Sequence, residues 1–431
     1  MIGWAGIARL GLVQMALGSV VVLTTATMNR VMVVELALPA ILPGLLVSLY
    51  YGTQFLRPRF GHGADQGGRR TPWILGGVGL LCLGALGASL SVGLMAQSAP
   101  LGIAVAIPSF LLIGLGIGAA GTNLLALLAT LVADDRQAAA GSLVWIMMIF
   151  GLASTGITAG FLLDPYTHAR LFQVTLGVCL VACTLSALGL WGQEGRSVAR
   201  KPSRQAQFGE VVAELWADTR VRLFTVFVFA SMLAYNLQDL ILEPFAGHVF
   251  GLTVGESTQL GGMHHAGALV GMLLVLVSGT ALRRWVHVPI RVWVVGGCLL
   301  SGAALLALAF GGAQAAHWPL GPNIFALGLA NGAFAVAAIG AMMRLAREGD
   351  ESREGLRMGL FGAAQAIAFG LGSFIGTALV DLMRALTPSD AIAYGTVFAF
   401  EGAVFLVAAL LAVRLTSPDE TAARAVMIPG E

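Results

Sequence analysis

Charge is the first thing that this 431-residue sequence lacks. Only 11% of its residues are Asp, Glu, Lys or Arg, the single lysine is Lys201, and the mean hydropathy is +0.85. A soluble domain has about 25% charged residues, so these values exclude a water-soluble protein. The four cysteines all lie in apolar runs and have no metal-like spacing. The sequence also has no alternating pattern typical of a barrel.

Motifs of catalysis and of nucleic-acid binding are missing as well. No nucleophile stands beside a base, and no nucleotide-binding loop or metal cluster is visible. The basic residues are spread among many segments and do not form one patch. We therefore expect neither an enzyme nor a nucleic-acid-binding protein.

Long apolar runs are what the sequence has instead, and 57% of its residues are hydrophobic. A helix needs about 20 apolar residues to cross the hydrocarbon layer, where its backbone groups must be satisfied internally. The runs predict an all-α membrane protein with twelve transmembrane helices. They fall near residues 10–29, 36–56, 73–96, 101–132, 139–163, 171–192, 223–246, 258–281, 287–312, 318–345, 356–380 and 391–414.

One polar stretch divides these runs into six and six. We expect an N-terminal six-helix bundle at 1–192, a cytoplasmic linker at 193–222, and a C-terminal bundle with a cytoplasmic tail at 223–431. Within the linker, a short amphipathic helix is expected from Phe208 to Thr219 on the membrane surface.

The basic residues predict the orientation. With a cytoplasmic N-terminus, every Lys and Arg except Arg30, Arg170 and Arg384 falls at the chain ends or near loops on one side. The positive-inside rule assigns that side to the cytoplasm. We therefore expect a multi-pass protein with both termini in the cytoplasm.

A weak internal repeat relates the two halves. A shift of 213 residues places Arg9 on Arg222 and Arg30 on Glu243. Asp164 and Asp381 follow the fifth span of each half. The repeat predicts two bundles related by a pseudo-two-fold axis.

The loop between the second and third spans carries a recognisable motif. In "GHGADQGGRRTPW" the motif residues are Gly61, Asp65, Gly68, Arg69 and Arg70. This resembles the loop motif of the major facilitator superfamily, which implies that superfamily's 6+6 fold. Asp65 is expected to accept hydrogen bonds from a helix N-terminus or an Arg and so latch the cytoplasmic face. In the alternative interpretation, Arg69 and Arg70 only determine topology.

Polar groups gather where the first and seventh spans end. Asp239 and Glu243 are one helical turn apart, Gln238 is adjacent, and Pro244 is expected to end the regular helix. We expect Arg30 at the end of the first span to pair with Asp239 or Glu243 and seal the extracytoplasmic side. The alternative is separate solvated charges at helix ends.

The segments "NRVMVVEL" and "QDLILEPFAGHVFGLTVGESTQL" carry a closer resemblance, which extends over essentially the whole chain. They resemble the PucC/LhaA-like bacteriochlorophyll delivery family of the major facilitator superfamily. The polar residues that match are Asn29, Arg30, Glu35, Gln238, Asp239 and Glu243. The resemblance implies a bacterial inner, intracytoplasmic photosynthetic membrane and a role in light-harvesting complex assembly. The implied partners are membrane lipid, bacteriochlorophyll, and antenna polypeptides or a reaction-centre antenna complex. The compact loop motif also points to the branch that serves bacteriochlorophyll synthase.

A few buried polar groups are candidates for binding such a pigment. His264 and His265 point about 100° apart on a helix, so only one can face a given cavity. His265 could supply the axial ligand to the pigment's magnesium, although a buried His that is simply hydrogen-bonded is the commoner case. Glu401 in the twelfth span has three candidate roles. It could bind a proton, bind a polar head group, or form a hydrogen bond to a neighbouring helix. Asn123, Asn331 and Gln365 are the amides available to ring carbonyls.

Two functional classes follow. The first is an assembly factor that binds, shields or delivers bacteriochlorophyll as cargo. The second is a proton-coupled secondary transporter of an amphiphilic small molecule, with Glu401 or Asp239 as the coupling carboxylate.

Overall fold

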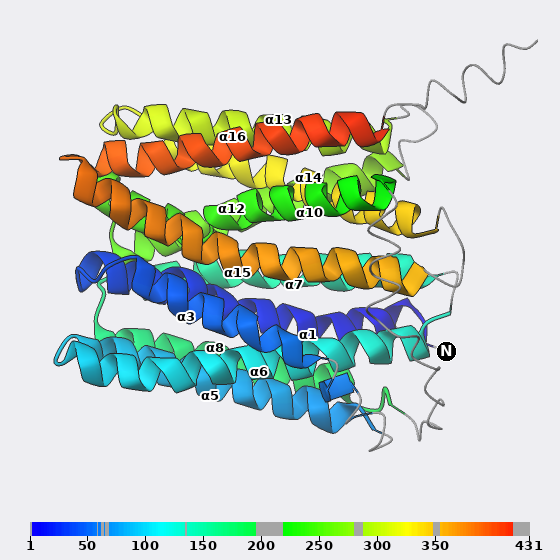
Figure 1. Ribbon diagram of the computed structural model, residues 1–431. Helices are drawn as coiled ribbons and strands as arrows, with labels where there is room; N and C mark the ends of the chain where they lie inside the picture. Colours follow the sequence, from blue (N-terminus) through cyan, green and yellow to red (C-terminus); the bar gives the residue numbers. More distant parts are fainter. Residues whose placement is uncertain are drawn as a thin grey trace, which may run out of the picture.

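Long apolar helices lie side by side through the whole computed structural model (Figure 1). The structure describes residues 2–57, 59–61, 64, 69–133, 136–194, 219–279, 288–347 and 354–416. Within these ranges, eleven helices are long and apolar enough to cross a membrane, and Ile41–Leu56 is a shorter apolar helix. Together they account for the twelve predicted spans, so the prediction of an all-α membrane protein is confirmed.

The first six spans come from the N-terminal half of the chain. Span 1 is α1 (Trp4–Val22), a π-helical segment (Leu23–Thr27), α2 (Met28–Arg30) and a second π-helical segment (Val31–Glu35). Span 2 is α3 (Ile41–Gly52) with a 3-10 turn (Thr53–Leu56). Spans 3 to 6 are α5 (Thr71–Met95), α6 (Ala99–Leu131), α7 (Gln137–Leu162) and α8 (His168–Leu190).

The last six spans come from the C-terminal half. Span 7 is α10 (Thr219–Leu237), a turn, and α11 (Leu242–Phe250). Spans 8 to 12 are α12 (Val254–Gly279), α13 (Ile290–Gly312), α14 (Leu320–Arg347), α15 (Glu354–Leu386) and α16 (Asp390–Thr416).

Each half has its own apolar core, and the halves meet along two helix pairs. Leu81 and Phe110 lie in a cluster built mainly from spans 1 to 6, and Phe227 and Phe334 in one built mainly from spans 7 to 12. Across the halves, α7 packs on α12 and α3 packs on α15. The fifth span of each half thus meets the second span of the other, as the pseudo-two-fold relation requires.

Span 1 is longer than its apolar run predicted. The helix continues past residue 29 to Glu35, so Arg30 lies inside it and is only 2% exposed. Two π-helical segments carry the helix through this polar region. Their i to i+5 hydrogen bonds widen the turn, and such segments occur frequently at functional sites. The wider turn also brings the side chains of Arg30 and Glu35 together.

Span 7 breaks earlier than predicted. The regular helix stops at Leu237 and a turn precedes α11. Pro244 therefore lies in the first turn of α11, where its missing N–H removes no hydrogen bond. Asp239 lies in the turn and Glu243 in α11, so the expectation that Pro244 ends the regular helix was wrong: the helix ends before Asp239.

The division into bundles at 1–192 and 223–431 stays a prediction. Most of the linker at 193–222, including the predicted surface helix up to residue 218, lies outside the described residues.

Candidate functional site: a buried polar cluster at the outer end

The site lies at one end of the bundle, which we call the outer end. Here the residues 36–40, 163–167, 251–253 and 387–389 connect the spans, opposite the N-terminus (Figure 1). The distribution of basic residues predicts that this end faces away from the cytoplasm.

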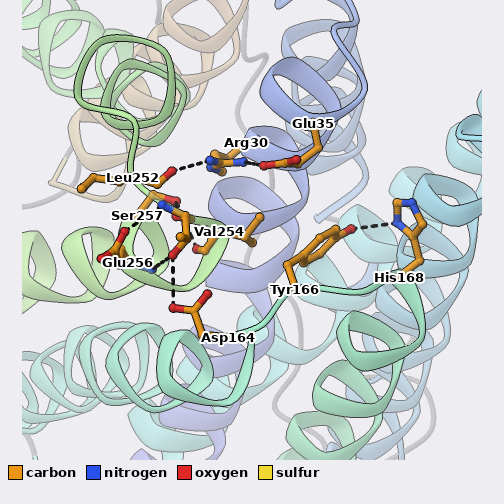
Figure 2. Close-up of polar contacts among 10 residues, drawn as sticks. Arg30, Glu35, Asp164, Tyr166, His168, Leu252, Val254, Glu256 and Ser257 are labelled. Carbon is orange, nitrogen blue, oxygen red and sulfur yellow. Dashed lines mark hydrogen bonds and ion pairs between the residues drawn. The ribbon is translucent and has the colours of Figure 1, made fainter.

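Arg30 links the two halves at this end (Figure 2). Its Nη1 donates to Glu35 Oε1 within span 1, and its Nη2 donates to the carbonyl of Leu252 at 2.6 Å. The predicted ion pair of Arg30 with Asp239 or Glu243 was therefore wrong. The actual partner, Glu35, has a 41% exposed side chain.

Two further bonds fasten span 1 to spans 7 and 8. The Asn29 Nδ2 donates to the carbonyl of Leu240 at 2.6 Å, in the turn between α10 and α11. The hydroxyls of Thr27 and Thr258 are 3.1 Å apart. These contacts place the break in span 7 directly against the π-helical part of span 1.

Two aspartates, Asp381 and Asp164, also join the two halves at the outer end. Both carboxylate oxygens of Asp381, on α15, accept from the N–H groups of Ala40 and Ile41 at 2.9 and 2.8 Å. Those groups begin α3, so the charge also lies at the positive end of a helix dipole.

Asp164 makes the corresponding contact in the other helix pair. Its Oδ2 accepts from the Thr253 hydroxyl at 3.1 Å, just before α12 (Figure 2). Thr253 and Glu256 form a capping box, with backbone-to-side-chain distances of 2.9 and 3.2 Å. The internal repeat paired Asp164 with Asp381, but only the structure shows that Asp381 caps a helix of the opposite half and that Asp164 binds the Thr253 hydroxyl just before another.

Tyr166 lies in the same loop region as Asp164. Its hydroxyl is 2.8 Å from His168 Nδ1 (Figure 2). Burial, reinforced by the nearby Glu35 carboxylate, raises the pKa of Tyr166, so the phenol stays neutral at physiological pH.

Behind these contacts lies a group of buried polar atoms that have no hydrogen-bond partner among the described residues. We call them the orphan atoms. Around the span 1 and span 7 contact they are Asn29 Oδ1, Arg30 Nε, Gln238 Nε2 and Oε1, and Glu243 Oε1 and Oε2. A buried polar group without a partner costs about 1–3 kcal/mol, so a small polar ligand or a proton bound among these atoms would stabilise this part of the described chain.

Two glycines leave room for the side chains of Glu243 and Arg30. A Cβ added to Gly261 on α12 would lie 2.5 Å from Glu243 Oε1, and one added to Gly247 would lie 3.0 Å from Arg30 Nη2. Gly247 is one turn from Glu243 on α11. The guanidinium of Arg30 and the carboxyl group of Glu243 are thus close enough to interact electrostatically, although no hydrogen bond joins these two described side chains.

Asp239 faces a different group of side chains. It is half-buried and close enough to interact electrostatically with Tyr50, Tyr51 and Tyr235. Phe369 of α15 packs on Tyr51 and Tyr235, with ring centroids 5.8 and 6.2 Å apart. Asp239 therefore belongs to an aromatic contact between α3, α10 and α15.

His264 and His265 have separate environments, as their helical spacing predicted. His264 is buried, with its Nε2 3.4 Å from Asn331 Nδ2, and Asn331 accepts from the Ser301 hydroxyl at 2.7 Å. His265 is half-buried, and its Nδ1 is another orphan atom of the described chain.

The remaining candidates lie apart from the cluster. Glu401 is fully buried, and both of its carboxylate oxygens are orphan atoms as defined above. It lies on α16 between Phe398, which packs on Phe245, and Phe405, which packs on Phe334. Glu401 is thus inside the core of spans 7 to 12.

The two other amides bind their own halves. Asn123 Nδ2 donates to the carbonyl of Ala119 at 2.9 Å within α6. Gln365 Nε2 is 3.7 Å from Met232 Sδ between α15 and α10. A role for either amide in ligand binding stays a prediction.

Only part of the loop motif lies within the described residues. Asp65 and Gly68 lie outside the described residues, so the predicted latch stays a prediction; Gly61 is half-buried and Arg69 exposed. A residue that the motif did not reveal caps the helix that follows. Glu194 accepts from the N–H groups of Arg70 and Thr71 at 2.5 and 2.7 Å, at the start of α5.

Two solved transporter structures have a similar arrangement of helices. The D-xylose-proton symporter superposes with a TM-score of 0.72 at 14% identity, over 95% of this chain and 97% of its own. The nucleoside transporter NupG gives 0.67 at 14% identity, over 96% and 100%. The fold is therefore the twelve-helix 6+6 fold of the major facilitator superfamily, as the loop motif implied.

Sequence relatives define the family within that fold. The family model described as "PUCC protein" matches residues 27–419, and the chain belongs to this family. It is 48% identical to the "Bacteriochlorophyll synthase 44.5 kDa chain" of Rhodobacter capsulatus over the full length of both chains. It is 32% identical to "Protein PucC" of Rhodobacter capsulatus, over 94% of this chain and 91% of that one. The resemblance to the PucC-type family is confirmed.

Proposed function

We propose that this protein is a photosynthetic complex assembly factor that binds, shields or delivers bacteriochlorophyll for light-harvesting complex biogenesis. The full-length match at 48% identity to a chain named for bacteriochlorophyll synthase supports a role around this pigment. The transporter fold supports a role in handling the pigment and not in synthesising it. The pigment is cargo, and the protein is a non-enzymatic partner of the synthase or of the antenna polypeptides.

The residue that fits the pigment best is His265. Bacteriochlorophyll carries a magnesium ion that takes an axial ligand, and a neutral imidazole is a suitable one. His265 is half-buried on α12, and its Nδ1 has no hydrogen-bond partner in the described part of the chain. His264 fits less well, because its Nε2 already faces Asn331.

Purification from the native phototroph tests both the pigment-binding function and the assignment of His265 as the ligand. We expect the wild-type protein to carry pigment that absorbs in the near infrared, and His265→Ala to lose most of it. His317→Ala, which changes an exposed His at the outer end, should retain the pigment. Wild-type protein without pigment would contradict the function, and pigment retention in His265→Ala would contradict the ligand.

Location and partners belong to the same proposal. We place the protein in the bacterial inner, intracytoplasmic photosynthetic membrane, with both termini in the cytoplasm. Affinity purification should recover bacteriochlorophyll synthase or small antenna polypeptides, and a labelled C-terminus should be digested only from the cytoplasmic side.

A proton-coupled secondary transporter is the second candidate. It is favoured by Glu243 and Glu401, buried carboxyl groups that lack hydrogen-bond partners among the described residues. Ionisable groups inside a membrane are expensive and commonly mark proton or substrate pathways. Uptake of an amphiphile into proteoliposomes that depends on an imposed pH gradient would favour this candidate over the first.

A further inference from the structure

Glu243 is a buried carboxyl group that accepts no hydrogen bond from the described residues. Its side chain is 3% exposed, and both oxygens lack a hydrogen-bond partner in that part of the chain. The nearby Arg30 gives its Nη donors to Glu35 and Leu252. A buried carboxylate without hydrogen bonds is less stable than a neutral carboxylic acid, so a small bound species would stabilise this side chain.

The size of the surrounding space limits that species. The orphan atoms of Glu243 and Gln238 each expose less than 1 Å², and Gly261 is packed so closely that a Cβ would meet Glu243 Oε1 at 2.5 Å. A pigment or other organic cargo does not fit against these atoms. Only a proton, a water molecule or a small cation remains.

The ligands available around Glu243 favour a proton over a metal cation. The guanidinium of Arg30 lies against Gly247, one turn from Glu243, and interacts electrostatically with that carboxyl. A metal ion would need several anionic or imidazole ligands, and the described residues contain no group of three or more His, Cys, Asp or Glu that could hold one. Protonation needs no further ligand and is therefore favoured.

Arg30 also has a choice of acceptors. In this structure it donates to Glu35 and to the carbonyl of Leu252, and the second bond joins span 1 to the start of span 8. Glu243, near the start of α11, competes with them as an acceptor for Arg30 when its carboxyl group is ionised. Transfer of Arg30 to Glu243 would release the bond to Leu252 and weaken the closed outer end.

We propose that Glu243 is a proton-binding site whose proton keeps Arg30 on Glu35 and Leu252, so that loss of the proton releases the contact between the halves at the outer end. This switch would operate with any cargo. It therefore goes beyond pigment binding and can fail independently of it.

Other titratable groups face the same region from the neighbouring elements. Arg30 and Asp239 interact electrostatically with Glu243, and the elements packed against α11 also carry Glu35 of span 1, His264, His265 and Glu256 of α12, and Asp390, Tyr394 and Glu401 of α16. Tyr394 is bonded to His248 at 3.0 Å. Variants of Glu243 must therefore be compared with variants of its neighbours.

The test measures a distance across the outer end as pH changes. Gln97 and Gln314 are exposed at the outer ends of opposite halves, so Gln97→Cys and Gln314→Cys carry spin labels in a full-length protein whose native cysteines are replaced. At acid pH we expect one distance, that of the closed end. Raising the pH should add a second population in which the end has opened.

Glu243→Gln mimics the protonated acid and should keep the closed distance at every pH. Glu35→Gln removes the competing acceptor, so opening should begin at a pH lower by about one unit, a tenfold change in proton affinity. Asp390→Asn is the control, because it removes a carboxylate of the same half that is partly exposed and already paired with Arg384 at 2.7 Å, and it should behave as wild type.

A second readout follows the proton itself. Infrared difference spectra of the wild-type protein should lose a carboxylic-acid carbonyl band over the same pH range, and Glu243→Gln should lack that band. An unchanged pH response in Glu243→Gln, a wild-type distance independent of pH, or opening driven by sodium at fixed pH would each overturn the proposal. Pigment retained by Glu243→Gln would show that the cargo site is separate.

Discussion

At the scale of single residues, the outer end is held by two aspartates that accept hydrogen bonds from the opposite half, Asp381 from backbone N–H groups and Asp164 from a side-chain hydroxyl. Asp381 accepts from both N–H groups at the start of α3, and Asp164 accepts from Thr253 before α12. Sequence reasoning could pair the two aspartates through the internal repeat. It could not find their partners, because Asp381 and Ala40 are 341 residues apart and the chain must fold before they meet.

Replacing Asp381 by Ala should destabilise the protein. The N–H groups of Ala40 and Ile41 lose their acceptor, and hydrogen bonds to a charged group are worth about 1.5–3 kcal/mol each. Thermal unfolding in detergent measures the effect. Asp390→Ala is the control, because its ion pair with Arg384 is partly exposed and should contribute little. Equal melting temperatures for the two variants would show that the Asp381 contact adds nothing.

Gly255→Ala tests the other aspartate. Its Cβ would lie 2.5 Å from Asp164 Oδ2 and 2.6 Å from the carbonyl of Gly160, so α7 and α12 would be pushed apart. We expect a clear fall in melting temperature. Gly296→Ala, where no described atom lies within 4 Å of the added Cβ, should stay within about 0.5 kcal/mol of wild type or become slightly more stable. A neutral Gly255→Ala would mean that this helix contact is loose.

At the scale of helices, the irregular elements position the polar cluster. The π-helical segments of span 1 bring Arg30 to Glu35, and the turn at 238–241 offers the carbonyl of Leu240 to Asn29. Apolar run lengths predicted where the spans lie but not these irregularities. Both depend on contacts between spans 1 and 7, which the pattern of either segment alone does not contain.

Asn29→Asp should be more harmful than Asn29→Ala. Aspartate cannot donate to the carbonyl of Leu240 and adds a negative charge at a buried position. Alanine only leaves that carbonyl without its donor, at a cost of about 1–3 kcal/mol. Pro244→Ala should be nearly neutral, because proline occupies a position in α11 where no N–H bond is lost. A Pro244→Ala variant as unstable as Asn29→Asp would show that the proline itself creates the break.

At the scale of the whole molecule, two halves with separate cores meet along α7 with α12 and along α3 with α15. The run of apolar segments, the loop motif and the repeat were enough to predict this architecture. Most of the buried polar residues of the candidate site were also predicted. Which of them would touch was not, because hydrogen bonding between helices is set by helix rotation, and apolar runs in a membrane leave rotation undefined.

A cysteine pair across the halves tests the closed outer end. The Thr27 and Thr258 hydroxyls are 3.1 Å apart, so Thr27→Cys with Thr258→Cys should form a disulfide under mild oxidation when native cysteines are replaced. Thr158, exposed on α7, gives the control pair Thr158→Cys with Thr258→Cys. A protease site inserted near residue 205 allows the chain to be cut between the two halves. If the disulfide has formed, the two fragments migrate together on a non-reducing gel. Separation of the fragments in both pairs would contradict the closed arrangement.

The brevity of span 2 has a consequence for the surrounding lipid. Its apolar helix covers Ile41–Leu56 only, which is 16 residues and about 25 Å long at the rise of α- and 3-10 helices. The hydrocarbon layer is about 30 Å thick, and Leu45 on this helix is half exposed. A short hydrophobic helix is accommodated by local thinning of the bilayer or by flanking side chains that reach the interface, and Arg59, three residues beyond Leu56, is exposed and placed for that second adjustment.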